Sequence, residues 1–174
     1  YFMRNPLDVA VSFAHHSGWD YDRTIEKMAD VSFAFCDRPR RLHNQLRQKL
    51  LSWSGHVESW TDGPSFPVHV MRYEDMKTRP FETFEKAVSF MDLPYTGGQI
   101  EKALAHSAFD VVQKQEAQHG FREKSPASAR FFRKGRTGSW REELNETQAE
   151  RIVADHAQVM GRFGYLDENG GIVY

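Results

Sequence analysis

Apolar residues recur at three- and four-residue steps immediately after an Asn-Pro pair near the start of the chain. Asn5 is a suitable N-cap and Pro6 suits the first helical position, so the pattern predicts a helix that begins there. Its core-facing side is predicted to carry Leu7, Ala10, Val11 and Ala14. The opposite, polar side is predicted to carry Asp8, Ser12, His15 and His16.

The same periodicity predicts helices in later segments. They cover residues 24–35, 40–60, 80–93 and 99–106, whereas residues 116–130 are predicted to form a loop. A last helix is predicted from Asn145, which has Gln148 three residues later in a capping-box arrangement, to a stop at Gly164.

Two short apolar runs, residues 1–3 and 68–71, have the character of strands that lead into helices. Strands that alternate with helices indicate an α/β fold with a parallel sheet. Two strands are few for such a sheet, and the first run resembles the end of a strand that starts upstream. We therefore expect residues 1–174 to be the C-terminal portion of a single domain.

The composition is that of a folded domain and not of a disordered chain. The 174 residues are 40% hydrophobic and 27% charged, and no apolar run is long enough to span a membrane. One cysteine, Cys36, excludes an internal disulfide and argues against a thiolate metal cluster. A single cysteine also fits a reducing compartment, so we expect a cytoplasmic protein.

The net charge of −1 conceals a strong segregation of charge. Residues 122–141 carry a net charge of +6, which leaves −7 on the rest of the chain. A local positive patch on an acidic body indicates one site for an anionic ligand. The alternative interpretation is a solvated basic loop.

Two motifs follow the predicted strands, where a parallel sheet collects its ligands. Arg4 follows the first strand and has a planar guanidinium that suits a phosphate, and Ser12 lies two helical turns further on. Tyr73 follows the second strand, where it can pack on a base or donate a hydrogen bond. Taken alone, Arg4 and Ser12 are better explained as a surface arginine and a helical serine, and Tyr73 is equally well a structural tyrosine.

A third motif, FFRKGRTGSW at residues 131–140, combines cations with glycines that permit close backbone approach to an anion. It is not the G-x-x-x-x-G-K-[ST] phosphate loop, and neither that pattern nor G-x-G-x-x-G occurs in the chain. These absences argue against a complete kinase, ATPase or Rossmann enzyme in the sequence as given.

Taken in order, four strings resemble the second half of the sulfotransferase family that uses 3′-phosphoadenosine 5′-phosphosulfate (PAPS), in its cytosolic type. They are RNPLDVAVSF, HVESW, RYEDMKTRP and FFRKGRTGSW, and the resemblance runs from about Met3 to Tyr165. RKGxxGxW after an RNPxDxxxS segment is specific, whereas RNP or YED alone is not. The resemblance implies a three-layer α/β fold of the P-loop NTPase-like type, a parallel sheet flanked by helices, without its N-terminal P-loop half.

The resemblance also implies a nucleotide site. Arg4, Ser12, Arg133, Lys134 and the amide of Gly135 would hold the 3′-phosphate of PAPS, Tyr73 would contact the adenine, and Ser107 and Phe109 would lie next to the base. The chain departs from the family's usual sequence pattern at Val112, where methionine is common, and at Ser139, where an acidic residue is usual.

The implied reaction is sulfuryl transfer from PAPS, as co-substrate, to the hydroxyl or amine of a small-molecule acceptor, without a metal. The family's catalytic histidine and phosphosulfate loop lie before the RNP segment, so the catalytic residues are unknown. His15 and His16 have no third ligand at metal-site spacing. No membrane or nucleic-acid partner is expected. Dimerisation is doubtful, because the segment WREELNETQAE lacks the Thr-Val pair by which some relatives dimerise.

Apart from an inactive family member that still binds the nucleotide, two alternatives stay open at the level of sequence. The first is a non-catalytic module that binds nucleotides or nucleic acids through the basic 122–141 loop, with Phe131, Phe132 and Trp140 as stacking residues. The second concerns the aromatic residues Trp19, Tyr21, Phe33 and Phe35, which form either one wall of an acceptor pocket or part of the core.

Overall fold

Two short strands that are far apart in the sequence pair in parallel. β1 (Phe2–Met3) lies beside β4 (Met71–Arg72), with Phe2 opposite Met71 and Met3 opposite Arg72. The structure is a computed structural model and describes residues 1–37 and 45–174. The predicted α/β class is confirmed. Of the parallel sheet flanked by helices that was predicted, the described residues contain the pair β1 and β4.

α1 (Pro6–Ser17) follows β1 and begins as predicted. The Asn5 side chain accepts a hydrogen bond of 3.0 Å from the Leu7 amide, and Gly18 ends the helix in the left-handed conformation. The predicted core face is fully buried. It packs with α2 (Tyr21–Ala29), α3 (Trp53–Thr61) and α8 (Glu146–Arg162) around a core that includes Leu7, Val11, Ile25, Val57, Ile152, Val159, Met160 and Tyr165. We call the four helices α1, α2, α3 and α8, with the core that they enclose, the body.

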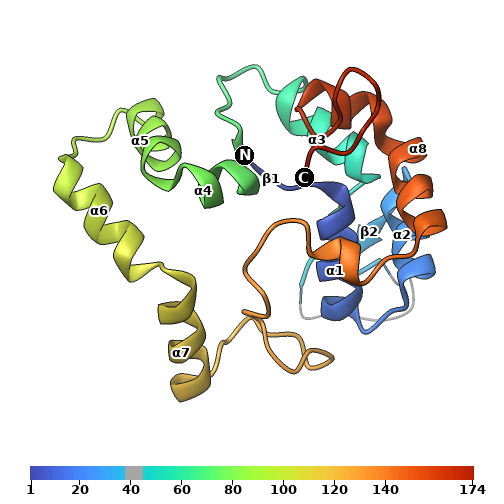
Figure 1. Cartoon of the computed structure of the whole chain (residues 1–174), viewed down its shortest axis with the longest axis horizontal. Helices are drawn as coiled ribbons and strands as arrows, with labels where there is room; N and C mark the ends of the chain where they lie inside the picture. The colour runs from blue at the N-terminus through green and yellow to red at the C-terminus, as the bar shows by residue number, and fades with distance from the viewer. Residues whose placement is uncertain (38–44) are drawn as a thin grey trace.

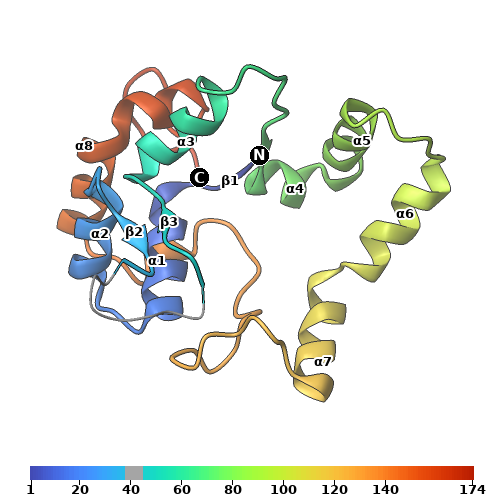
Figure 2. The same ribbon diagram turned by 180° about the vertical axis from the view of Figure 1, so that it is seen from behind.

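The helices after β4 extend away from the body as an arm (Figures 1 and 2). The arm consists of α4 (Tyr73–Thr78), α5 (Pro80–Phe90), α6 (Gly97–His106) and α7 (Phe109–His119). A long loop, residues 120–138, returns from α7 to the body and leads into the 3₁₀ turn η1 (Ser139–Glu142) and α8. The arm and this loop therefore face α1 across the middle of the molecule.

Two predicted helices were too long. α2 ends at Ala29 because the Asp30 carboxylate accepts hydrogen bonds from the backbone and hydroxyl of Ser32, which turns the chain. The chain then forms β2 (Ala34–Phe35), antiparallel to β3 (Gln48–Lys49). Of the predicted helix 40–60, residues 40–44 lie outside the described residues, and α3 begins only after the Ser52 cap.

The predicted helices 80–93 and 99–106 correspond to α5 and α6, and the predicted last helix corresponds to α8. The helices α4 and α7 were not predicted. α7 continues to His119, so the start of the predicted loop 116–130 is helical. The capping box of α8 is confirmed, because the Gln148 amide donates to the Asn145 side chain at 2.9 Å and the Asn145 amide donates back at 3.2 Å. Among the described helices, none is long and apolar enough for a membrane span.

Candidate functional site: a pocket between body, arm and glycine loop

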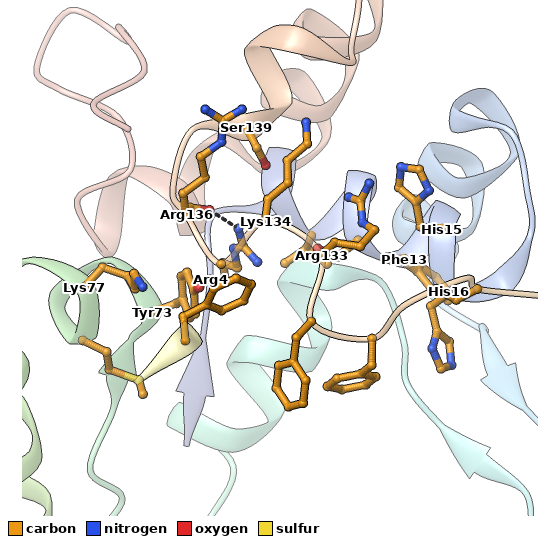
Figure 3. A pocket seen from close by; sticks show the side chains of 18 of the residues that line it. Arg4, Phe13, His15, His16, Tyr73, Lys77, Arg133, Lys134, Arg136 and Ser139 are labelled. Atoms are coloured by element: carbon orange, nitrogen blue, oxygen red, sulfur yellow. Dashed lines mark hydrogen bonds between the residues drawn. The ribbon is translucent and has the colours of Figure 1, made fainter. Parts of the chain in front are cut away.

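A pocket of about 1020 Å³ lies between the body, the arm and the 120–138 loop. It is lined by every residue that the sequence analysis assigned to a nucleotide site: Arg4, Ser12, Tyr73, Ser107, Phe109, Arg133, Lys134 and Gly135. These residues come from four separated segments of the chain, and the fold brings them together. Figure 3 shows the pocket with Arg4, Tyr73, Arg133 and Lys134 around it.

Arg4 follows β1 and is held from three sides. One guanidinium nitrogen donates to the Asp8 carboxylate at 3.1 Å and to the Arg136 carbonyl at 2.8 Å, the contact drawn in Figure 3. The guanidinium also lies 4.3 Å from the centre of the Tyr73 ring. Its Nε is buried and has no hydrogen-bond partner among the described residues. Arg4 is therefore oriented by the protein while it keeps an unused donor.

Tyr73 opens α4 directly after β4, as the position of its motif predicts. Half-burial of the phenol is the main cause that raises its pKa above the usual value, and the neighbouring Arg4 opposes that rise. Tyr73 thus presents a neutral phenol and an aromatic face to the pocket. Ser12, in contrast, is an exposed residue of α1 that also lines the pocket.

Gly135 and Phe109 are in direct contact. A Cβ atom at Gly135 would lie 2.1 Å from Cδ2 of Phe109, and the backbone at Gly135 has a φ of +60°. Only glycine fits both constraints. The glycine loop, residues 131–138, thereby lies against the first turn of α7, next to Ser107, whose hydroxyl donates to the Ala103 carbonyl at 2.9 Å.

The glycine loop is fixed to the arm by a carboxylate that the sequence analysis did not single out. Glu116 of α7 accepts hydrogen bonds from the backbone amides of Phe131 and Phe132, at 2.7 and 2.9 Å. These bonds lower the pKa of the Glu116 carboxyl. The rings of Phe131 and Phe132 pack on Phe121, at centroid distances of 4.4 and 5.1 Å, and on each other.

Asp8 fixes the other end of the glycine loop, and here the sequence prediction was wrong. Asp8 was placed on the polar, outer side of α1, but it is 1% exposed. Its carboxylate accepts hydrogen bonds from the amides of Gly138 and Trp140, at 2.8 and 3.1 Å, and from the Ser139 hydroxyl at 3.0 Å. Together with the bond from Arg4, these contacts make Asp8 the link between the RNP segment and the glycine loop. The i, i+4 spacing of Arg4 and Asp8 was the available signal.

The cations of the glycine loop are paired with two adjacent glutamates. The Lys134 ammonium lies 2.7 Å from Glu143 and 3.1 Å from Glu142, Arg133 lies 3.6 Å from Glu143, and Arg136 pairs with Glu142. In Figure 3 the side chains of Lys134 and Arg136 point away from Tyr73. The +6 of the basic stretch is thus reduced locally by carboxylates that follow it in sequence.

Aromatic residues of the body line the far wall of the pocket. Phe13, Phe33 and Phe35 pack on one another with centroid distances between 5.4 and 5.9 Å, and all three line the pocket. Phe35 meets the other two rings edge to face. Trp19 packs on Phe13 at 5.4 Å but does not line the pocket. Phe33 and Phe35 therefore form part of the pocket wall, and Trp19 lies outside its lining.

No cluster of three or more potential metal ligands is present among the residues that the structure describes. The chemistry that the pocket offers is that of cations, backbone amides, hydroxyls and aromatic faces. Such a set suits a phosphorylated ligand that carries an aromatic base.

Comparison with known proteins identifies the family. The sequence model of the sulfotransferase domain matches residues 1–164. The chain belongs to the sulfotransferase domain family. It is 28% identical to sulfotransferase 1A1 of Canis lupus familiaris over 92% of the chain and 54% of that protein. It is 26% identical to sulfotransferase 6B1 of Danio rerio over 86% of the chain and 47% of that protein.

The fold of this sulfotransferase-family chain also matches solved structures. The crystal structure of mouse sulfotransferase SULT7A1 complexed with PAP has a TM-score of 0.67 at 19% identity, over 92% of this chain and 57% of that one. Retinol dehydratase in complex with androsterone and the inactive cofactor PAP has a TM-score of 0.66 at 20% identity, over 92% and 46%. The chain spans about half the length of the curated relatives it matches.

Proposed function

We propose that residues 1–174 form the C-terminal portion of a single sulfotransferase domain that transfers a sulfuryl group from PAPS to the hydroxyl or amine of a small-molecule acceptor. In this proposal the chain supplies the site for the 3′-phosphate and the adenine of the donor. One observation carries it: the eight residues that the family resemblance assigns to that site line one pocket. The PAP in the names of two structural neighbours supports the same ligand class.

Each end of the nucleotide would meet a different part of the pocket. Arg4, Ser12, Arg133, Lys134 and the Gly135 amide would hold the 3′-phosphate through charge-assisted hydrogen bonds. Tyr73 and Phe109 would pack on the adenine, with Ser107 beside the base. The positive φ of Gly135 and its contact with Phe109 support this division, because they bring phosphate and base subsites together.

The reaction would break the bond between the sulfur of PAPS and the oxygen that bridges to its 5′-phosphate. A bond forms between sulfur and the acceptor oxygen or nitrogen, the acceptor proton passes to a general base, and adenosine 3′,5′-bisphosphate (PAP) leaves. We propose that the base and the groups around the 5′-phosphosulfate come from outside residues 1–174. The described residues would bind and orient the donor, which is a large part of catalysis by position and electrostatics.

The aromatic wall supports an acceptor that buries an apolar surface. Phe13, Phe33 and Phe35 face the same pocket from the body side, opposite Ser107 and Phe109. We place the acceptor on this side, and we retain a cytoplasmic location as the prediction from the single cysteine.

The decisive experiment compares two nucleotides on the full-length protein. PAP should stabilise it more than adenosine 5′-monophosphate does, because only PAP carries the 3′-phosphate. At a concentration 100 times its dissociation constant, PAP should contribute about 2.7 kcal/mol to the free energy of unfolding. Equal stabilisation by the two nucleotides would contradict the proposed 3′-phosphate site.

A pair of variants separates a nucleotide pocket from a general anion-binding loop. Arg133→Ala should weaken PAP far more than the monophosphate, whereas Arg122→Ala, which removes a charge of the same basic stretch outside the pocket lining, should change neither. Tight, sequence-independent binding of single-stranded nucleic acid, with a steep salt dependence and equal sensitivity to both variants, would favour the non-catalytic module instead.

A further inference from the structure

Glu143, which follows η1, receives contacts from residues of α1, α2 and the glycine loop. One carboxylate oxygen lies 2.7 Å from the Lys134 ammonium and 3.6 Å from the Arg133 guanidinium. The other accepts the Tyr21 hydroxyl and lies 2.9 Å from Nε2 of His15. A single side chain thus joins the two adjacent cations of the loop to two helices of the body.

Glu143 is built to stay charged. Burial alone would raise the pKa of its carboxyl, but hydrogen bonds from Lys134, Tyr21 and His15 outweigh burial and lower the pKa to about 2. Burial and the bond to Glu143 raise the pKa of Tyr21 to about 12, so the Tyr21 hydroxyl remains a donor at neutral pH. The contacts of Glu143 with Tyr21 and Lys134 therefore persist across the physiological pH range.

The neighbouring Glu142 has a different environment. Its side chain is 53% exposed, against 15% for Glu143, and its partners Lys134 and Arg136 both belong to the glycine loop. Among the partners that the described residues provide, Glu142 has none in α1 or α2, so it links the glycine loop to the segment that follows it. The two glutamates form a natural pair of test and control residues, because they have the same charge and adjacent positions.

We propose that Glu143 is a positioning residue for the 3′-phosphate clamp formed by Arg133 and Lys134. This inference rests on the proposed function and adds the residue that holds the clamp in place. Long cationic side chains lose rotamer entropy when a ligand immobilises them. A carboxylate fixed by Tyr21 and His15 restricts both side chains before the ligand arrives.

The clamp retains donors for a ligand while it is held. A lysine ammonium has three donors and an arginine guanidinium has five, and Glu143 engages only part of each set. Arg133 in particular contacts Glu143 through one terminal nitrogen, and among the described residues the remainder of its planar group has no ion-pair partner. Positioning by Glu143 and binding of a phosphate by the same residues are thus compatible.

The experiment measures dissociation constants of PAP and adenosine 5′-monophosphate by calorimetry on the full-length protein and its variants. Glu143→Gln, which keeps the shape and removes the charge, should weaken PAP about tenfold and leave the monophosphate within about twofold. Glu143→Asp should restore part of the loss, because it returns the carboxylate. Glu142→Gln should keep the wild-type ratio of the two constants.

Tyr21→Phe provides a second route that leaves every charge in place. It removes the hydroxyl that fixes Glu143, and it should reduce the preference for PAP by a smaller factor in the same direction. This variant decides the matter if Glu143→Gln does not fold, which thermal unfolding monitors.

The outcomes separate this inference from the proposed function. If the wild-type protein binds both nucleotides equally, the proposed function fails. If the wild type prefers PAP and Glu143→Gln keeps that preference, or if Glu142→Gln loses as much, Glu143 is not the positioning residue. Tighter PAP binding by Glu143→Gln would also overturn the inference, because Glu143 would then compete with the phosphate.

Discussion

Gly135 lies against the ring of Phe109 so closely that a side chain at position 135 has no space. The nearest ring atom would be 2.1 Å from a Cβ atom, and the backbone at Gly135 is in the left-handed region. Gly135→Ala should therefore displace Phe109 or the loop. We expect on the order of a tenfold loss of affinity for PAP and a loss of about 1–3 kcal/mol in the free energy of unfolding.

Gly161 provides the matched control for this glycine. It lies in α8, and a Cβ atom there would meet no neighbouring atom of the described residues within 4 Å. Gly161→Ala should therefore stabilise the helix by up to about 1 kcal/mol. Calorimetric binding and denaturant unfolding of both variants test the claim. Wild-type affinity in Gly135→Ala would show that the contact with Phe109 does not shape the site.

Asp8→Asn should be among the most destabilising single changes in the body. The buried carboxylate accepts four hydrogen bonds. The NH2 group of an asparagine side chain would face one of these hydrogen-bond donors, and Arg4 would lose its charge partner. We expect a loss of about 2–4 kcal/mol, measured by denaturant unfolding. Asp110→Asn, at an exposed position beside Lys114, should cost less than about 0.5 kcal/mol. Equal costs for the two variants would contradict this account.

Tyr165→Phe tests the buried carboxylate of Glu74. Glu74 is fully buried and accepts from the Asn5 amide and the Tyr165 hydroxyl, each at 3.0 Å. Removing the hydroxyl leaves one carboxylate oxygen without its partner, so unfolding should become easier by about 1–3 kcal/mol. Tyr95→Phe removes an exposed hydroxyl bonded to Ser89 and should be nearly neutral. The account fails if the two losses are alike.

His156 should make the stability of the protein depend on pH. The ring is 3% exposed, contacts the Ser54 hydroxyl at 2.9 Å, and has a pKa that burial lowers from 6.5 to about 4. Above pH 6.5 the ring is neutral in both states and its contribution is complete. Between pH 6.5 and 4 the His156 ring is protonated in the unfolded chain but stays neutral in the folded chain. The free energy of unfolding therefore decreases as the pH is lowered through this range, by at most about 3 kcal/mol.

The measurement is denaturant unfolding of wild type and His156→Leu between pH 7 and pH 4. The variant should lose the part of the slope that His156 contributes, while other groups keep theirs. An unchanged slope in the variant would show that another residue controls stability in this range.

Local signals in the sequence predicted local structure well. Asn5-Pro6 placed the start of α1, and Asn145 with Gln148 placed the start of α8, because caps involve residues a few positions apart. The same kind of signal was missed at Asp30 and Ser52, where side-chain bonds to nearby amides end one helix and begin another. Apolar spacing continued through both points and predicted helices that were too long.

Contacts between distant segments were beyond the reach of periodicity. Asp8 belongs to the polar side of α1 by spacing, and only the return of the loop 130 residues later buries it. Glu143 lies in a segment that mixes acidic and basic residues, so nothing near it in the sequence sets it apart. Its partners His15 and Tyr21 lie more than a hundred residues away. The family motifs located the pocket residues, but they did not indicate which carboxylates hold them.

The separation of arm and body has a consequence for folding as well as for binding. Tyr73, Ser107 and Phe109 belong to the arm, whereas Arg4 and Ser12 belong to the body, and the pocket is the space that both enclose. A molecule bound there contacts both parts at once. Its binding energy then opposes every partial opening in which the arm separates from the body, so occupancy should make the two parts unfold together as one cooperative unit.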